Sequence, residues 1–110
     1  MDKFLRGYLE ALLWLGVLTD GMSIDDIDAS AIASAKEDCD DFQKANAADL
    51  EATGADDGQL GHDFYLTRNR HGAGFWDRGY GPAGDRLTKA AHVYGDSTAY
   101  LGDDDRVYLL

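Results

Sequence analysis

The chain has 110 residues, 45% of them hydrophobic, and a formal net charge of −11. This length predicts one small domain, and the hydrophobic content excludes a disordered chain. The single cysteine, Cys39, excludes an internal disulfide and a cysteine-based metal site. The apolar start is interrupted by Asp2 and Glu10, lacks a signal-peptide cleavage site and is too short for a membrane span, so we expect a cytoplasmic protein.

The first half of the chain predicts two helices. Apolar residues recur at helical spacing from Phe4 to Leu15, which predicts a helix over residues 3–18 that stops at residues 19–21. Ser23 is expected to cap a short turn. A second helix is predicted over residues 30–47, followed by a further turn at 48–52 and a polar connection at 54–61. The buried face of the second helix is expected to hold Ile32, Ala35, Cys39 and Phe42.

The second half of the chain changes to aromatic, β-branched and glycine residues. Residues 64–67 predict a strand, and Phe75 with Trp76 predicts the start of a paired strand. Asp85 is expected to cap a third helix that ends at Gly95. The remaining predicted elements are a turn at 69–74, the body of that helix at 86–94, strands at 98–101 and 107–110, and a turn between them at 102–105.

Together these elements predict a single α+β domain over residues 1–110. Two N-terminal helices and a third helix are expected to pack on a small antiparallel sheet. The domain has an acidic helical part, residues 1–53, and a glycine- and aromatic-rich part with the strands, residues 61–110. Residues 1–60 carry 14 acidic and four basic residues, whereas residues 61–110 carry seven and six. Such a field repels nucleic acid and attracts basic surfaces.

The carboxylates of the first half suggest a partner-binding surface. A helix face lined with acids presents charges at spacings comparable to those of a phosphate backbone, so it can occupy the groove of a nucleic-acid-binding protein. The alternative is a solvated face that only keeps the protein soluble. The carboxylates expected to bind the partner are Asp25, Asp26, Asp28, Glu37, Asp38, Asp40 and Asp41.

The segment from Gly61 to Gly81 suggests a ligand pocket instead. In a strand at 64–67, residues 62, 64, 66 and 68 would share a face, and paired arginines beside glycine turns can bind a phosphate or carboxylate group. The segment has neither a P-loop nor a dinucleotide-binding pattern, and we expect no metal and no cofactor. Acid–base catalysis by a histidine with Asp77, and a purely structural role for the arginines and aromatics, stay open. The possible pocket residues are His62, Arg68, Arg70, His71, Phe75, Trp76 and Asp77.

The same segment is the main part of a resemblance to a known protein family. The block GHDFYLTRNRHGAGFWDRG, with the later LTKAAHVYG at residues 87–95 and the opening GYLEALLW, resembles a family of small proteins encoded by bacteriophages and prophages. Tyr65 and Arg70 differ from the residues expected in relatives. The resemblance implies a phage product that acts in the bacterial cytoplasm, and it implies no particular chemistry.

These observations favour an acidic interaction protein that is not an enzyme. We expect it to bind and inhibit a basic, nucleic-acid-handling host protein of a defence system, by nucleic-acid mimicry and without binding nucleic acid or a membrane itself. The alternative is a small ligand-binding or catalytic protein with its pocket around Gly61–Gly81. A third possibility is an assembly accessory of the virion.

Overall fold

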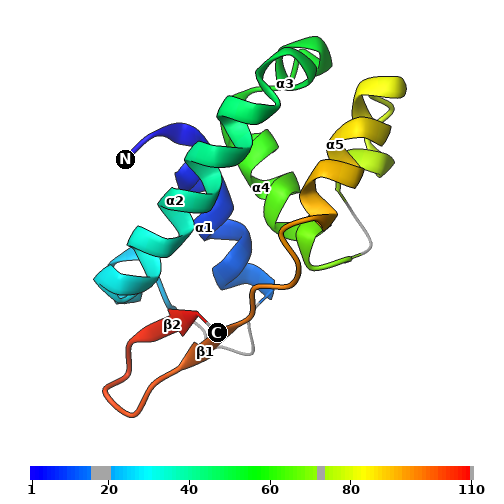
Figure 1. Cartoon of the computed structure of the whole chain (residues 1–110). Helices are drawn as coiled ribbons and strands as arrows, with labels where there is room; N and C mark the ends of the chain where they lie inside the picture. Colours follow the sequence, from blue (N-terminus) through cyan, green and yellow to red (C-terminus); the bar gives the residue numbers. More distant parts are fainter. Residues whose placement is uncertain (16–20, 72–73, 110) are drawn as a thin grey trace.

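The computed structural model describes residues 1–15, 21–71 and 74–109, and within them the chain is mostly helical with one two-stranded antiparallel sheet (Figure 1). The predicted α+β class is confirmed at this level. In chain order the elements are α1 (Lys3–Leu15), η1 (Ile24–Asp26), α2 (Ala29–Ala45), α3 (Ala47–Thr53), α4 (Asp57–Arg68), η2 (Phe75–Asp77), α5 (Pro82–His92), β1 (Ala99–Leu101) and β2 (Val107–Leu109), where η marks a 3-10 helix.

Helices α1 and α4 run side by side in the same direction, and their backbones touch (Figure 1). A Cβ atom on Gly7 would lie 2.0 Å from the carbonyl oxygen of Gly58, and one on Gly61 would lie 1.9 Å from that of Phe4. Any side chain at these glycines would therefore push the helices apart. The close approach brings the two helix amino termini to the same end of the molecule.

Aromatic rings from four elements fill the centre of the core. Phe42 of α2 stacks on Phe64 of α4, with ring centroids 4.1 Å apart, and on Phe75 of η2 at 5.7 Å. Tyr8 of α1 meets Phe64 at 5.5 Å. All four rings are fully buried. Ring pairs at such distances add about 0.5–1.5 kcal/mol each beyond the burial of their area, so this cluster holds α1, α2 and α4 together.

The predicted strand at residues 64–67 is wrong, because these residues lie in the last turns of α4. Residues 63–68 are all buried, so this part of the helix is enclosed on every side and has no solvent-facing polar stripe. Without that periodicity, Phe-Tyr-Leu-Thr has the composition of a strand. The helix begins inside the predicted polar connection, where the side chain of Asp56 accepts a hydrogen bond from the backbone N–H of Gln59 at 2.8 Å.

The predicted strand at Phe75 and Trp76 is also wrong, because these residues form η2. The hydroxyl of Thr67 accepts a hydrogen bond from the backbone N–H of Phe75 at 3.1 Å, and a Cβ on Gly74 would lie 2.3 Å from that same oxygen. The tight turn directs Phe75 into the core and leaves Trp76 51% exposed. Part of the turn predicted at 69–74 lies outside the described residues.

The other predicted helices are present with shifted ends. The first helix was expected to reach residue 18 and is described to Leu15, and residues 16–18 lie outside the described part. The turn predicted after α2 is a separate helix, α3, which Gly54 ends at a positive φ of 72°. Helix α5 starts at Pro82, because proline suits a first helical turn, so Asp85 lies within that turn instead of capping it. Ile32, expected in the core, is half-buried.

The two C-terminal strands are confirmed, with Tyr100 opposite Tyr108. The hairpin is joined to the first half of the chain by a bridge between Ile27 and Val107, and the backbone N–H of Asp28 donates to the carbonyl of Val107 at 2.8 Å. It therefore lies beside the start of α2 (Figure 1). Helix α5, which was expected to pack on the sheet, contacts mainly α3, α4 and η2. None of the described helices has the length and apolar character that crossing a membrane requires.

Candidate functional site

Arg68, expected in a ligand pocket, is a buried link between four parts of the fold. Its guanidinium donates to the hydroxyl of Tyr8 at 3.0 Å and to the carboxylate of Asp38 at 2.7 Å. It also donates to the backbone carbonyls of Gly95 at 2.9 Å and Tyr94 at 3.2 Å. These bonds engage four of its five N–H donors. The residue is only 5% exposed, so it holds the protein together and has little capacity to bind a ligand.

A second ion pair, which the sequence analysis missed, joins the buried Asp63 to the partly exposed Arg78 on the other face of α4. Asp63 is fully buried and accepts hydrogen bonds from the side chains of Gln59 at 2.9 Å and Arg78 at 3.0 and 3.1 Å. The hydroxyl of Tyr80 lies 3.4 Å from its other oxygen. A buried carboxylate needs such donors, so Asp63 fixes the segment after η2 against α4. Both residues are in the block of the sequence that suggested a pocket.

The remaining residues of the expected pocket lie in separate environments. Phe75 is in the core, whereas Arg70 and Asp77 are exposed. His62 lies beside Trp14 of α1, with ring centroids 6.0 Å apart. A helix turns successive residues by about 100°, so residues that would share one face of a strand point in different directions here. The structure thus does not bring the predicted set into one pocket.

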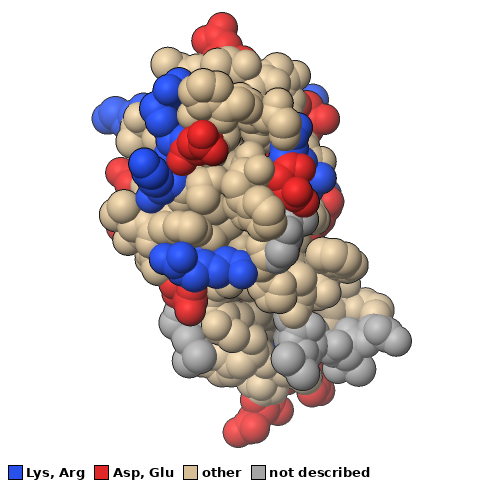
Figure 2. All heavy atoms as spheres, turned by 90° about the vertical axis from the view of Figure 1, so that its right-hand side faces the viewer, with Lys and Arg blue, Asp and Glu red and all other residues tan. Residues whose placement is uncertain are grey.

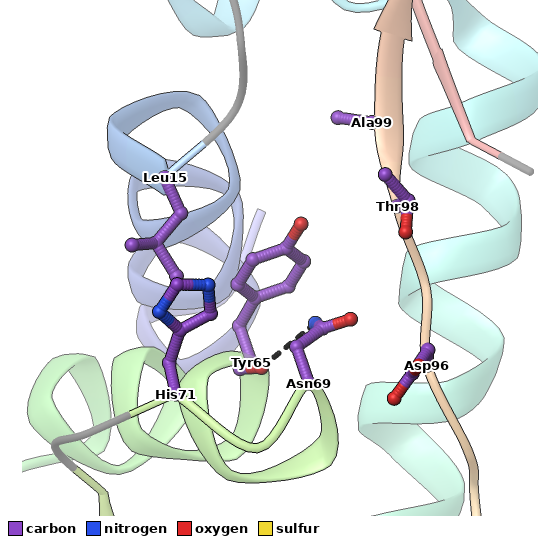
Figure 3. A pocket seen from close by; sticks show the side chains of 7 residues that line it. All are labelled: Leu15, Tyr65, Asn69, His71, Asp96, Thr98 and Ala99. Atoms are coloured by element: carbon purple, nitrogen blue, oxygen red, sulfur yellow. Dashed lines mark hydrogen bonds between the residues drawn. The ribbon is translucent and has the colours of Figure 1, made fainter.

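His71 lines a small cavity of about 170 Å³ between the end of α1, the end of α4 and β1 (Figure 3). The ring of Tyr65 points into it between Leu15 and Ala99. The side chain of Asn69 donates to the carbonyl of Tyr65 at 2.9 Å, and burial raises the pKa of the Tyr65 hydroxyl to about 12. A hydroxyl with this pKa stays protonated at neutral pH, so it can donate a hydrogen bond but does not act as a base.

The carboxylates predicted on α2 are largely engaged within the chain. Asp38 pairs with Arg68, Asp40 pairs with Lys36, and Asp41 accepts a hydrogen bond from the hydroxyl of Tyr94. Glu37 is exposed and makes no hydrogen bond or ion pair with any other described residue. Lys36 and Arg68 balance the charges of Asp40 and Asp38, so only part of the negative charge on the outer face of α2 is left, carried by Glu37 and Asp41.

The other three predicted carboxylates belong to a cluster that the fold assembles. The Ile27–Val107 bridge places the segment around η1 beside the hairpin turn, and Arg106 donates to the side chain of Asp28 at 3.2 Å and to the carbonyl of Ile27 at 3.1 Å. Arg106 is the one basic residue in these two segments. We call this region the acidic hairpin end, and its six carboxylates are Asp25, Asp26, Asp28, Asp103, Asp104 and Asp105.

Exposed apolar and aromatic side chains lie on the same hairpin as these carboxylates. The rings of Tyr100 and Tyr108 stack across the two strands at 5.7 Å, Tyr100 is 44% exposed, and Leu101 is 37% exposed. Tyrosine is enriched in protein interfaces because its ring is apolar and its hydroxyl is polar. Figure 2 shows acidic side chains at the lower end of the molecule, which is the hairpin end of Figure 1, and the lysines and arginines visible on this face lie above it.

Local hydrogen bonds keep part of the acidic hairpin end ionised. The hydroxyl and backbone N–H of Ser30 and then Arg106 lower the pKa of Asp28, and the hydroxyl of Tyr108 lowers that of Asp104. The neighbouring Asp104 carboxylate in turn raises the pKa of Tyr108 to about 12. These two aspartates therefore carry full negative charge at neutral pH.

Comparison with models of known protein families, with characterised proteins and with solved structures found no match. Among residues 1–15, 21–71 and 74–109, no group of three or more histidine, cysteine, aspartate or glutamate side chains is placed to hold a metal ion. The resemblance to phage proteins therefore remains a hypothesis from the sequence.

Proposed function

We propose that the protein is an acidic interaction protein that binds a basic, nucleic-acid-handling bacterial protein and blocks its nucleic-acid site. The contact is made by the acidic hairpin end. The observation that carries this proposal is that the fold joins two segments that together hold six carboxylates and one basic residue, Arg106, beside a stacked pair of tyrosines of which Tyr100 is 44% exposed.

The charge distribution supports this assignment over the outer face of α2. Asp25, Asp103 and Asp105 are exposed and make no hydrogen bond or ion pair with another described side chain, so their charges are free to face a partner. Opposite charges on two proteins accelerate their association, and aromatic side chains at the same surface slow dissociation because they bury apolar area. A protein with a net charge of −11 that meets a basic groove therefore competes with nucleic acid for it.

The host setting of the proposal comes from the resemblance to phage proteins. A phage product of this kind meets the nucleic-acid-binding proteins of the infected bacterium, and those of its defence systems are the partners we propose. The virion-accessory alternative predicts a stable oligomer of this chain and no such partner.

The experiment compares two variants with equal loss of charge. One carries Asp25→Asn, Asp103→Asn and Asp105→Asn at the acidic hairpin end. The control carries Glu37→Gln, Glu51→Gln and Asp77→Asn, three exposed carboxylates elsewhere. Proteins that the wild-type chain captures from a bacterial lysate at low salt and releases at high salt are purified. Their affinity for nucleic acid is then measured alone and in the presence of the wild-type chain or of each variant.

We expect the wild-type chain and the control variant to compete with nucleic acid for the captured protein. The hairpin variant should compete at least about tenfold less well, since it removes three of the unpaired charges at the interface. If both triple variants compete as well as the wild type, or if no captured protein binds nucleic acid, the proposal is wrong.

A further inference from the structure

A groove of about 510 Å³ lies between α1 and the start of α4, away from the acidic hairpin end. Its floor is formed where the backbones of Gly7 and Gly58 touch. Three basic side chains line it, namely Lys3 and Arg6 from α1 and Arg78 from the segment after η2. In a strongly acidic chain, such a local group of cations calls for an explanation.

Two of these cations are free to bind. Lys3 and Arg6 are exposed and make no ion pair within the described residues. Arg78 is oriented by Asp63, which accepts from its Nε and one Nη2 donor. The Nη1 group of Arg78 makes no hydrogen bond within the described part of the chain, so it is available to a ligand in the groove.

The same groove also contains two carboxylates, and they do not neutralise the cations by pairing. One oxygen of Asp56 accepts the backbone N–H of Gln59 at 2.8 Å, which caps α4. Glu10 lies one turn beyond Arg6 on α1 and forms no ion pair within the described residues. The positive side chains thus face the groove without a carboxylate in direct contact, apart from the buried Asp63.

The position of the cations on their helices is unfavourable for folding. Helices α1 and α4 run in the same direction, so both amino termini, with their partial positive charge, lie at this end. The chain supplies a carboxylate to each end, since Asp2 accepts the backbone N–H of Leu5 at 2.7 Å and Asp56 caps α4. Lys3 and Arg6 nevertheless lie in the first turn of α1, where the partial positive charge of the helix end disfavours cations.

A further polar atom of this groove lacks a partner. The Nδ1 atom of His62 is buried and makes no hydrogen bond in the described structure. The ring lines the groove and contacts Trp14, which is 72% exposed. Buried polar atoms are nearly always satisfied, so a small polar group such as a water molecule is expected next to this atom at the edge of the ring that lines the groove.

We propose that this groove binds the phosphate group of a small phosphorylated molecule. Arg6 and Lys3 contact the phosphate oxygens from α1, and the fixed Arg78 contacts them from the opposite side. Nucleic acid is a poorer ligand, because its many charges would be repelled by the net charge of −11, whereas a single phosphate meets only the local field. The exposed Trp14 lies outside the groove but beside His62, which lines it, so an aromatic group of a ligand that extends past His62 stacks on the Trp14 ring.

The test follows backbone amide signals by NMR while inorganic phosphate, a sugar phosphate or adenosine monophosphate is added at constant ionic strength. We expect saturable shifts at the groove with all three, strongest with adenosine monophosphate because of Trp14. The variants are Lys3→Gln and Arg6→Gln, and the matched control is Lys89→Gln, an exposed lysine on α5.

Each of the first two variants should weaken binding by about tenfold, since each removes a charge-assisted hydrogen bond, and the control should bind as the wild type does. Neither substitution removes a contact of the fold, so the ligand-free variants should melt at or above the wild-type temperature. The proposal is overturned by the absence of saturable shifts with every compound, or by equal affinity in all three variants. Binding to a basic partner uses the hairpin end, so either proposal can fail without the other.

Discussion

The outer face of α2 has four carboxylates and the acidic hairpin end has six, and the two regions differ in the cations that face these carboxylates. On α2 the chain supplies a partner for most acids, and Asp38 is paired with a buried arginine. At the hairpin end Arg106 donates to Asp28, and the two segments hold five further carboxylates and no other basic residue. The comparison teaches that the number of acids in a segment does not give the field that a partner meets, because internal cations remove part of it.

Replacing Arg68 with methionine removes the cation that pairs with Asp38 on α2. This change has the largest expected effect on stability. The change leaves the Tyr8 hydroxyl and two backbone carbonyls without a donor, so it should lower the free energy of unfolding by about 3 kcal/mol. Chemical denaturation measures the difference. The control is Arg86→Met, which removes an exposed pair with Asp49 and should cost less than about 1 kcal/mol. Equal effects of the two variants would contradict the structural role of Arg68.

Replacing Arg70 with glycine sharpens the contrast between Arg70 and the buried Arg68. Arg70 is exposed, forms no ion pair in the described part of the chain and has a positive φ of 56°. Glycine adopts this conformation without strain, so the variant should be more stable by about 1 kcal/mol. Thermal melting tests this expectation, and a lower melting temperature would show that the Arg70 side chain makes a stabilising contact.

Neutralising the hairpin end should change stability less. Asp25, Asp103 and Asp105 hold no structural hydrogen bond through their side chains, so their combined replacement by asparagine should shift the free energy of unfolding by no more than about 0.5 kcal/mol. Relief of repulsion between the acids makes the expected sign stabilising, most visibly at low salt. A loss that exceeds this value at any salt concentration would mean that these carboxylates support the hairpin.

The smallest effect is expected in the melting temperature at acidic pH. Hydrogen bonds in the folded chain hold the pKa values of Asp28 and Asp104 below the ordinary value of 3.8, so their stabilisation is complete above that pH and is lost as the pH falls through the lower folded values. Asp28→Asn should therefore flatten the decline of melting temperature below about pH 4 relative to the wild type, which thermal melting over a pH series measures. The same acid slope in the variant and the wild type would contradict the assignment.

The sequence predicted the elements that have one buried face and did not predict those that are enclosed. Helices α1 and α2 each have a buried face at helical spacing, and the hairpin has a run of turn residues between two short apolar segments, so each was found close to its expected place. Residues 63–68 of α4 are buried on every side, so their composition suggested a strand.

The candidate site was predictable only in part for a related reason. Net charge identified the acidic half, but the acidic hairpin end depends on contacts such as that of Arg106 with Asp28, which are 78 positions apart. The expected pocket depended on strand geometry, so it was lost when residues 62–68 proved helical.

The contact of Gly7 and Gly61 with the opposite helix has a consequence for how the molecule folds. Glycine inside a helix lowers its intrinsic stability, and α4 contains two glycines within its first five residues, so an isolated α4 peptide should be largely unfolded in water. It becomes helical only when α1 is already beside it. Because more than 40 residues separate the two helices, the rate of folding should be set by closing that long loop.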